Sequence, residues 1–136
     1  MFSVLVVDDS TQLAEIYGGI AARAINCQLT TASVAGDALE LVRRHQFDVI
    51  VTDLRMHGRL RGLEILREAK IRDELTQVIV VTSWGDPRMA VEAMSMGAFD
   101  YLSRANTSVD VLEVLPFKLR LAGLMRRLLL DARGRA

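Results

Sequence analysis

Short runs of apolar, mostly β-branched residues alternate with segments of helical periodicity, and this alternation limits the possible folds most strongly. The clearest run is Val49–Thr52, which ends in Asp53 and is followed by a glycine-containing loop. Such a run is typical of a strand buried on both faces of a sheet. Strand and helix alternate five times, and parallel neighbours need crossover connections. The sequence therefore predicts an α/β fold, a doubly wound parallel sheet with helices on both faces.

Capping residues predict where several helices begin and end. The first helix is expected over about Thr11–Ala24, with Ser10 as its N-cap. Ser33 is expected to cap the second helix, and Pro87 suits the first position of the fourth, which Gly97 should end. The remaining strands are expected at residues 4–7, 28–32, 77–81 and 99–103.

Three carboxylates stand at predicted strand ends. The run Val4–Val7 leads directly into Asp8 and Asp9, and Asp53 ends the central run. A lone Asp after a strand would more simply cap the next helix, but adjacent parallel strands would bring all three acids to one pocket. Two unit charges 4 Å apart interact by roughly 4 kcal/mol at an effective dielectric near 20, so a cation is expected among them. Oxygen ligands without a Cys or His cluster favour Mg²⁺ over zinc.

Composition sets further bounds. With 136 residues, the chain is predicted to form a single domain over residues 1–136. Acidic and basic residues balance at 17 each, which argues against direct nucleic-acid binding by this domain. No apolar run approaches the length of a membrane span, and no signal-type segment precedes the first strand. A cytoplasmic protein without membrane contact is expected.

Residues 116–136 are predicted to form an extended, kinked C-terminal helix, because Pro116 interrupts a helical pattern that runs from Ser108 to Leu130. Two apolar stripes follow this pattern, one able to cover the sheet and one left exposed. They are Leu112, Leu115, Leu119 and Ala122, and Val114, Phe117, Leu121, Met125 and Leu128. An exposed apolar stripe usually marks a partner surface, so a homodimer contact or a connection toward further domains is expected. The same tail is basic, with six Lys or Arg residues against Asp131 alone.

Five short motifs at strand ends and at one helix start occur together and in order. They are Val6-Val7-Asp8-Asp9-Ser10, Asp53-Leu54-Arg55-Met56, Gly62-Leu63-Glu64, Val81-Thr82-Ser83 and Gly97-Ala98-Phe99-Asp100-Tyr101-Leu102. With them the chain resembles the receiver domain of two-component response regulators over about Ser3 to Leu115. The resemblance implies a flavodoxin-like sheet of five parallel strands in the order 2-1-3-4-5, and a signalling switch rather than an enzyme.

The resemblance also implies roles for individual residues. Asp53 would accept a phosphoryl group from a histidine kinase or phosphotransfer protein. Mg²⁺ would be held by Asp9, Asp53 and the backbone carbonyl of Arg55, with Asp8 acting through water. Thr82 would donate a hydrogen bond to the phosphoryl oxygen, and Tyr101 would follow it into a buried rotamer.

The chain departs from the receiver pattern at two places beside this site. Arg104 and Ala105 replace the usual lysine and the proline after it, and Arg is longer and planar. His57 replaces the usual proline of the loop after Asp53, which is one residue longer than the family spacing. Arg55 and Trp84 hold the two positions that flank the path of attacking water in the family, and they could tune the lifetime of the phosphoryl group.

Two other classes of protein fit parts of the sequence. A pseudo-receiver would use the same fold as an interaction module without phosphorylation, and Arg104 with the altered loop supports this alternative. A phosphatase with an aspartyl nucleophile would need two acids separated by one residue, whereas Asp8 and Asp9 are adjacent.

Overall fold

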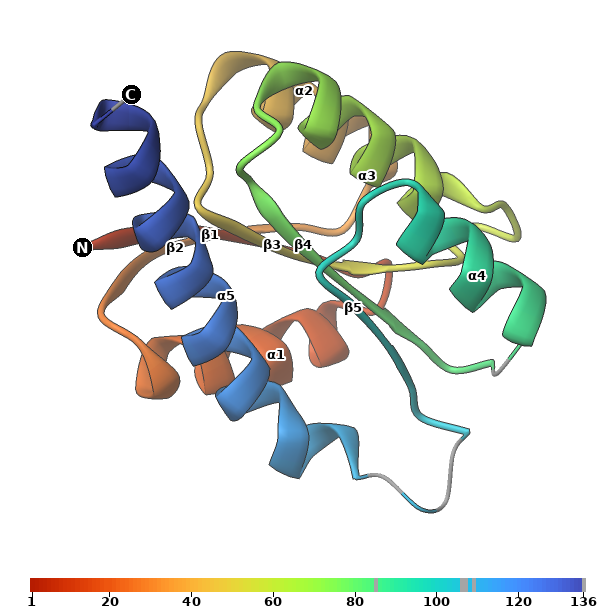
Figure 1. Cartoon of the computed structure of the whole chain (residues 1–136). Coiled ribbons are helices and arrows are strands. Elements are labelled where there is room, and N and C mark those ends of the chain that lie inside the picture. Colours follow the sequence, from red (N-terminus) through yellow and green to blue (C-terminus); the bar gives the residue numbers. More distant parts are fainter. Residues whose placement is uncertain (85, 106–107, 109, 136) are drawn as a thin grey trace.

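A parallel five-stranded sheet lies between two layers of helices in the computed structural model, which describes residues 1–84, 86–105, 108 and 110–135 (Figure 1). The strands are β1 (Phe2–Val7), β2 (Cys27–Ala32), β3 (Val49–Asp53), β4 (Gln77–Thr82) and β5 (Asp100–Ser103). The helices are α1 (Thr11–Ala24), α2 (Ala35–Arg44), α3 (Arg61–Arg72), α4 (Pro87–Ser95) and α5 (Val111–Gly134). The strand order β2-β1-β3-β4-β5 confirms the predicted doubly wound, flavodoxin-like fold.

The two faces of the sheet support separate apolar cores. Helices α2, α3 and α4 cover one face, and α1 and α5 cover the other (Figure 1). Along β1, Leu5 faces the first core while Val4 and Val6 face the second, because successive side chains of a strand point to opposite faces. Burial on both faces explains why the central strands β1, β3 and β4 read as mostly apolar runs.

The register of the central strands decides where the acidic residues meet. Val7 of β1 pairs with Thr52 of β3, so both strands end at the same level of the sheet. The next residue along each strand is an acid, Asp8 after Val7 and Asp53 after Thr52. Parallel pairing in this register therefore brings the two carboxylates to one edge.

The N-cap of α1 is confirmed, whereas that of α2 is not the predicted residue. Ser10 caps α1, and its hydroxyl accepts a hydrogen bond from the Leu13 N–H at 3.2 Å. Helix α2 begins at Ala35 with Val34 as its N-cap and has no side-chain capping bond, so the prediction for Ser33 is wrong. The side chain of Ala35 is almost fully buried, and packing rather than a hydroxyl sets this helix start.

Helix α4 begins and ends at the predicted signals. Pro87 occupies its first turn, where a missing N–H costs little. Asp86 precedes it, and its carboxylate accepts from the Arg88 N–H at 2.9 Å. Gly97 follows the helix with a φ of 96°, a conformation that favours glycine.

Helix α5 is continuous from Val111 to Gly134, so it begins before the predicted residue 116 and includes Pro116 in its interior. Proline leaves the carbonyl of Leu112, four residues earlier, without its helical partner. Leu112 is 48% exposed and lies in the first turn of the helix. One proline near an exposed first turn is therefore compatible with a continuous helix.

The two apolar stripes of α5 separate as expected, with one exception. Leu115, Leu119 and Ala122 are fully buried against the sheet. Leu112, predicted to join them, is exposed, and Val111 takes its place in the core. The second stripe remains largely on the surface.

Arg126 anchors the second half of α5 to the sheet. The contact lies at the end of the sheet that is opposite to the cluster of Asp8, Asp9 and Asp53. Its side chain is only 3% exposed, and its guanidinium pairs with Asp48 at 2.7 Å and with Asp73 at 2.9 Å. The second oxygen of Asp48 accepts from the Ser3 N–H at 2.7 Å, and Asp73 accepts from Gln46. One buried cation thus joins α5 to the start of β3 and the end of α3.

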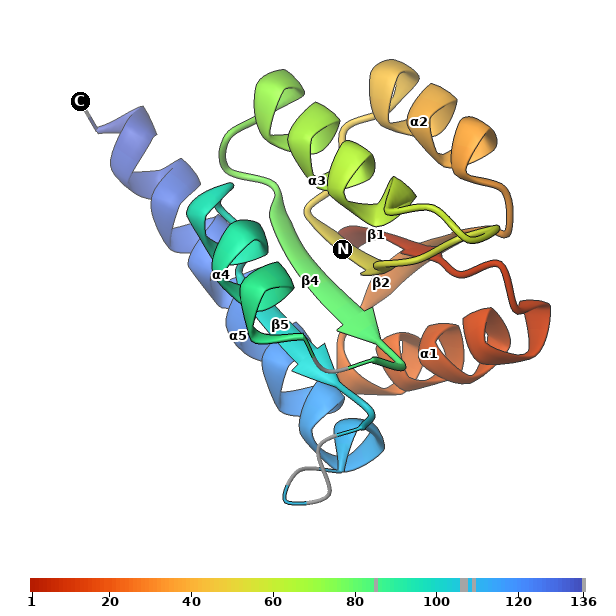
Figure 2. The same ribbon diagram turned by 90° about the vertical axis from the view of Figure 1, so that its right-hand side faces the viewer.

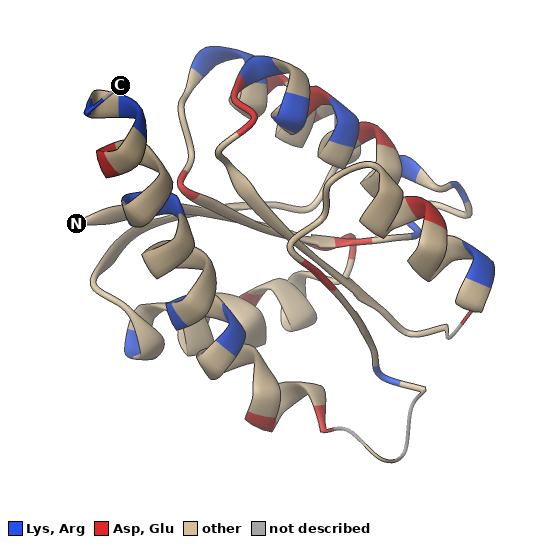
Figure 3. Ribbon diagram, in the orientation of Figure 1, with Lys and Arg blue, Asp and Glu red and all other residues tan. Residues whose placement is uncertain are grey.

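Other arginines of α5 also contact the body of the domain. Arg120 donates to the carbonyl of Ala24 at 3.3 Å, capping the end of α1. Arg127 lies 4.6 Å from the centre of the Phe2 ring, a cation–π contact. The basic charges of the tail are distributed along α5 (Figure 3), and several of them are engaged within the domain rather than forming a free basic surface. No helix in the described ranges is long and apolar enough to span a membrane.

Replacing Arg126 with alanine should destabilise the fold by about 2–4 kcal/mol, because two largely buried carboxylates lose their shared cation. Urea unfolding measures the change. Arg133→Ala is the matched control, since Arg133 pairs with Glu74 on the exposed surface and its loss should cost less than about 1 kcal/mol. Equal effects of the two substitutions would contradict a structural role for Arg126.

Candidate functional site

Asp8, Asp9 and Asp53 converge at the carboxyl edge of the sheet, as the sequence predicts. One oxygen from each carboxylate lies within 4.8 Å of those of the other two. Asp8 is buried, Asp53 is partly buried and Asp9 is exposed, so the cluster opens to solvent on one side. The arrangement offers oxygen ligands only, which suits a hard divalent cation.

The carboxylates of this cluster repel one another when they are ionised. Burial, together with the charges of Asp8 and Asp9, raises the pKa of Asp53 to about 7. Burial also raises the pKa of Asp8, against the lowering effects of the Ser10 N–H bond and the Arg104 charge. A bound cation would relieve this repulsion, and the donor set therefore fits Mg²⁺.

Gly62 allows α3 to start directly against the end of β3. A Cβ atom at this position would overlap the backbone carbonyl of Asp53 and approach the Leu54 Cα within 2.8 Å. The Gly62 N–H donates to the Leu54 carbonyl at 3.0 Å. The Gly62-Leu63-Glu64 motif predicted a helix start. Only the folded chain shows why glycine is required, because two backbone segments approach closely beside Asp53.

Thr82 and Tyr101 both contact the backbone of Trp84 in the loop after β4. Thr82 is 1% exposed, and its hydroxyl oxygen accepts from the Trp84 N–H at 3.2 Å. The Tyr101 hydroxyl donates to the Trp84 carbonyl in a long contact of 3.4 Å.

Arg104 lies at the end of β5 beside β4. Its backbone N–H donates to the Thr82 carbonyl at 2.7 Å, and its guanidinium is 3.4 Å from the Ser83 hydroxyl. The side chain is exposed, but its charge acts on Asp8. Positive charge is thus present at the edge where the receiver pattern has a lysine.

Arg55 and Trp84 line a hollow of about 500 Å³ beside the site, together with the start of α4. The Trp84 side chain is 68% exposed. The two positions that the sequence assigned to control of water access therefore border the same open space.

Tyr17 of α1 is a site neighbour that sequence reasoning missed. Its side chain is 2% exposed, and burial raises its pKa. The charges of Arg104, Asp8 and Asp53 all act on its phenol. Helical spacing marked Tyr17 as a core residue, but spacing along α1 carries no information about what its hydroxyl faces.

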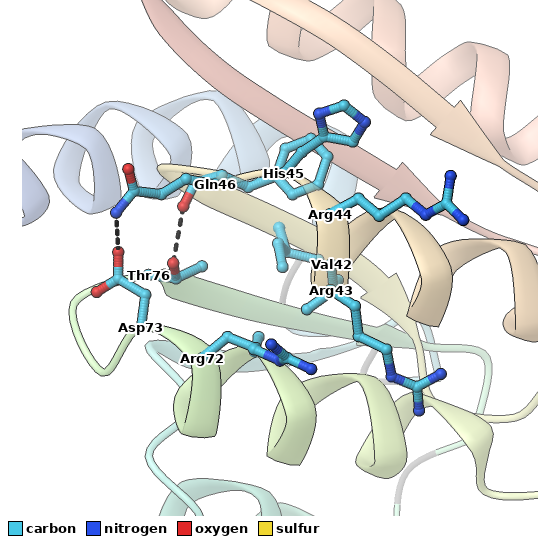
Figure 4. A pocket seen from close by; sticks show the side chains of 11 residues that line it. Val42, Arg43, Arg44, His45, Gln46, Arg72, Asp73 and Thr76 are labelled. Atoms are coloured by element: carbon cyan, nitrogen blue, oxygen red, sulfur yellow. Dashed lines mark hydrogen bonds between the residues drawn. The ribbon is translucent and has the colours of Figure 1, made fainter.

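A second hollow, of about 240 Å³, lies away from the acidic cluster between the C-terminal ends of α2 and α3 (Figure 4). Arg43, Arg72 and Asp73 border it. All three are already paired, because Arg43 and Arg72 both contact Glu68 and Asp73 contacts Arg126. Helix C-termini carry partial negative charge, so this hollow is poorly suited to bind anions.

Comparison with known proteins defines the family. The family model described as "Response regulator receiver domain" matches residues 4–115. The chain belongs to this family of two-component signalling modules. It is 34% identical over 102 residues to the DNA-binding transcriptional regulator NtrC of Escherichia coli, a match that covers 74% of this chain and 21% of NtrC. It is 51% identical over 55 residues to the regulator FixJ of Azorhizobium caulinodans, covering 40% of this chain and 26% of FixJ. The chain thus spans about a fifth to a quarter of these relatives.

Solved structures agree with this assignment. A response regulator receiver domain protein from Clostridium thermocellum aligns with a TM-score of 0.80 and 28% identity, over 95% of this chain and 99% of that one. The beryllofluoride-activated NtrC4 receiver domain dimer aligns with a TM-score of 0.79 and 26% identity, over 93% and 99%. The receiver fold therefore extends over nearly the whole chain.

Replacing Asp53 with asparagine should stabilise the metal-free protein at pH 8, because it removes a carboxylate that folding disfavours in its charged form. Each unit of pKa shift corresponds to about 1.4 kcal/mol. Partial exposure reduces the effect, so we expect a gain in the free energy of unfolding of about 1–3 kcal/mol. The folded-state pKa lies above the ordinary value of 3.8, so folding favours the neutral acid and stability falls as the pH rises toward and past 7. The advantage of Asp53→Asn should therefore shrink as the pH is lowered from 8 to 5. Urea unfolding in the presence of a chelator measures it. A gain that is independent of pH would contradict this account.

Proposed function

We propose that this domain accepts a phosphoryl group on Asp53 and uses the modification to change a partner surface. The observation that carries the proposal is the cluster of Asp8, Asp9 and Asp53, with the buried Thr82 at the end of the neighbouring strand β4. The donor would be a phosphohistidine of a histidine kinase or phosphotransfer protein in the cytoplasm. Neither membrane contact nor direct nucleic-acid binding is part of this proposal.

The transfer itself is a displacement at phosphorus. A carboxylate oxygen of Asp53 attacks, a new P–O bond forms, and the P–N bond to the donor imidazole breaks with its electron pair leaving on nitrogen. The nucleophile must be ionised, which a pKa near 7 only half achieves in the metal-free site at neutral pH. Reaction therefore requires positive charge at the cluster.

Mg²⁺ would be held by Asp9, Asp53 and the backbone carbonyl of Arg55, with Asp8 contributing through water. When bound, the ion would offset the negative charge that gathers on the phosphoryl oxygens. Asp8 is buried within the same cluster as the nucleophile, so in its ionised form it would strengthen the local field that attracts the cation.

Thr82 and Tyr101 would convert the local change into a surface change. The Thr82 hydroxyl would donate to a phosphoryl oxygen and draw the loop after β4 inward. That loop includes Trp84, and the Tyr101 hydroxyl contacts the Trp84 carbonyl. Movement of the loop would therefore break or re-form the contact between Tyr101 and Trp84. Such a coupling is a local electrostatic event read out by a two-state element.

Arg104 would contact the phosphoryl group in place of the usual lysine. A guanidinium is planar and offers several donors, so it binds a phosphoryl oxygen with a different geometry from an ammonium. Its contact with Ser83 keeps it close to the loop that carries Thr82. A pseudo-receiver that binds partners without phosphorylation remains the alternative function, and Arg104 and the longer loop are the features that favour it.

Intact mass after incubation with a small phosphodonor and Mg²⁺ tests the proposal. The parent should gain one phosphoryl group, and Asp53→Asn should gain none because it lacks the nucleophile. Asp9→Asn should react at least about tenfold more slowly, since it weakens the cation site. A parent that neither gains mass nor binds Mg²⁺ would favour the pseudo-receiver.

The decay of the phosphorylated mass, followed in the same experiment, tests the proposed control of water access. Trp84 presents a large exposed indole to the hollow that Arg55 also lines. Trp84→Ala should therefore shorten the lifetime of the phosphoryl group. An unchanged lifetime would show that this residue does not restrict water.

We propose that a second copy of this domain covers the exposed face of α5. Phe117, Leu121, Leu124 and Leu128 recur at alternating intervals of four and three residues and are each at least half exposed. This spacing is that of a two-helix seam. It lies on the opposite side of α5 from the residues buried against the sheet. The similarity to a receiver domain that is itself a dimer supports pairing.

Charge on the flank of this seam favours a parallel pair. In an antiparallel pair, Arg120 of one copy would face Arg127 of the other on both sides, which is unfavourable. In a parallel pair these arginines would not face each other. The parallel arrangement also places both C-termini at the same end.

The double substitution Leu121→Glu with Leu128→Glu should convert the dimer to a monomer, because it places charge in the middle of the apolar seam. Sedimentation of the full chain over a range of concentrations measures the change. Leu112→Glu is the matched control, an exposed leucine of α5 outside the seam, and should leave the dimer intact. A parent that stays strictly monomeric at high concentration would contradict the proposed pair.

A further inference from the structure

The loop after Asp53 folds as a tight hairpin rather than as an irregular connection. The N–H of Met56 donates to the Arg59 carbonyl at 2.9 Å, and the N–H of Arg59 donates to the Met56 carbonyl at 3.1 Å. The two residues between them, His57 and Gly58, have φ values of 53° and 75°. Two consecutive left-handed residues are typical of a two-residue type I′ turn.

Both ends of this hairpin are fixed to the core. The Met56 side chain is fully buried, which holds the first arm against the sheet. Shortly after the second arm, Gly62 packs without a Cβ against the backbone of Asp53. The tip at His57 is exposed, but its position relative to β3 is determined by these anchors.

The tip of the hairpin contacts a carboxylate of the acidic cluster. The backbone N–H of His57 donates to Oδ2 of Asp9 at 3.1 Å, across 48 residues of sequence. This donor exists because residue 57 is not proline, which has no N–H. A proline also could not adopt the φ of 53° that aims this N–H at Asp9.

We propose that the hairpin is a positioning element for the metal centre, in which the His57 N–H holds one oxygen of Asp9 and leaves the other free to bind the cation. The inference rests on the proposed function, because it concerns the same site. Asp9 is exposed and repelled by Asp8 and Asp53, so without a donor its side chain would turn toward solvent. A backbone N–H opposes that movement and keeps the ligand in place before the cation arrives.

The proposal assigns the effect to the backbone of residue 57, not to its imidazole. Any residue that tolerates a left-handed conformation should therefore serve, and glycine should serve well. The identity of the side chain matters only through the turn. This distinguishes a positioning role from direct metal binding by the histidine.

Titration of Mg²⁺ alone into the metal-free protein, followed by the fluorescence of the single tryptophan, Trp84, tests the inference. His57→Pro should weaken Mg²⁺ binding by about tenfold or more, as expected on loss of an outer hydrogen bond to a metal ligand. His57→Gly is the matched control, because it keeps the N–H and suits the turn, and its affinity should stay within about twofold of the parent. Comparable weakening in His57→Gly would show that the imidazole is the ligand and would overturn the proposal.

A second measurement detects the contact without any metal. Amide hydrogen exchange, observed by NMR, should be slow at His57 in the parent and faster in Asp9→Ala, which removes the acceptor while leaving the hairpin bonds of Met56 and Arg59. Exchange at Arg59 provides the internal control and should not change. Equal exchange at His57 in both proteins would overturn the proposal.

The outcomes separate this inference from the proposed function. A parent that binds no Mg²⁺ would contradict both. A parent that binds Mg²⁺ with the same affinity as a folded His57→Pro would contradict the positioning role alone. If His57→Pro fails to fold, His57→Val replaces it, since a β-branched residue is strained at a positive φ and should displace the N–H, weakening Mg²⁺ binding in the same direction.

Discussion

Electrostatic repulsion among three carboxylates at one edge of the sheet is the constraint on which the rest of the site depends. The apolar burial of β1 and β3 forces Asp8 and Asp53 to the same level, and Asp9 follows directly. Burial first, and then the charges of Asp8 and Asp9, raise the pKa of Asp53 to about 7. This cluster of oxygen donors suits a hard divalent cation, which would offset the repulsion among the three acids.

Most of the surrounding groups that order this edge are uncharged, and Arg104 is the cation beside them. Gly62 lets α3 begin against the carbonyl of Asp53, and the hairpin tip brings a backbone N–H to Asp9. Thr82 supplies a buried hydroxyl from the neighbouring strand. Most of these groups are neutral, so they can direct the acids while leaving the net charge for a cation to balance.

The opposite edge of the sheet has the reverse arrangement, with one buried cation between two carboxylates. Arg126 joins the far half of α5 to Asp48 and Asp73, and its neighbours Arg120 and Arg127 add contacts with α1 and β1. Figure 2 shows that the final turns of α5 project beyond the sheet. These contacts therefore fix the orientation of α5, although the helix extends beyond the apolar core. As a result, its apolar outer face always points away from the sheet.

The sequence by itself determined the order of elements, the parallel sheet and the meeting of Asp8, Asp9 and Asp53, because the period of apolar residues and the acids at strand ends are local signals. It also separated the buried from the exposed side of α5. Only the tertiary structure decided that Arg126 is buried, that the charges of the site act on the Tyr17 phenol and that the longer loop turns back to Asp9. The contacts of Arg126 with Asp48 and of His57 with Asp9 join residues that are 48 or more positions apart in the sequence. The environment of Tyr17 depends on the direction in which its hydroxyl points. The spacing of residues along the chain does not predict such partners, because they are determined by how the helices and strands pack against one another.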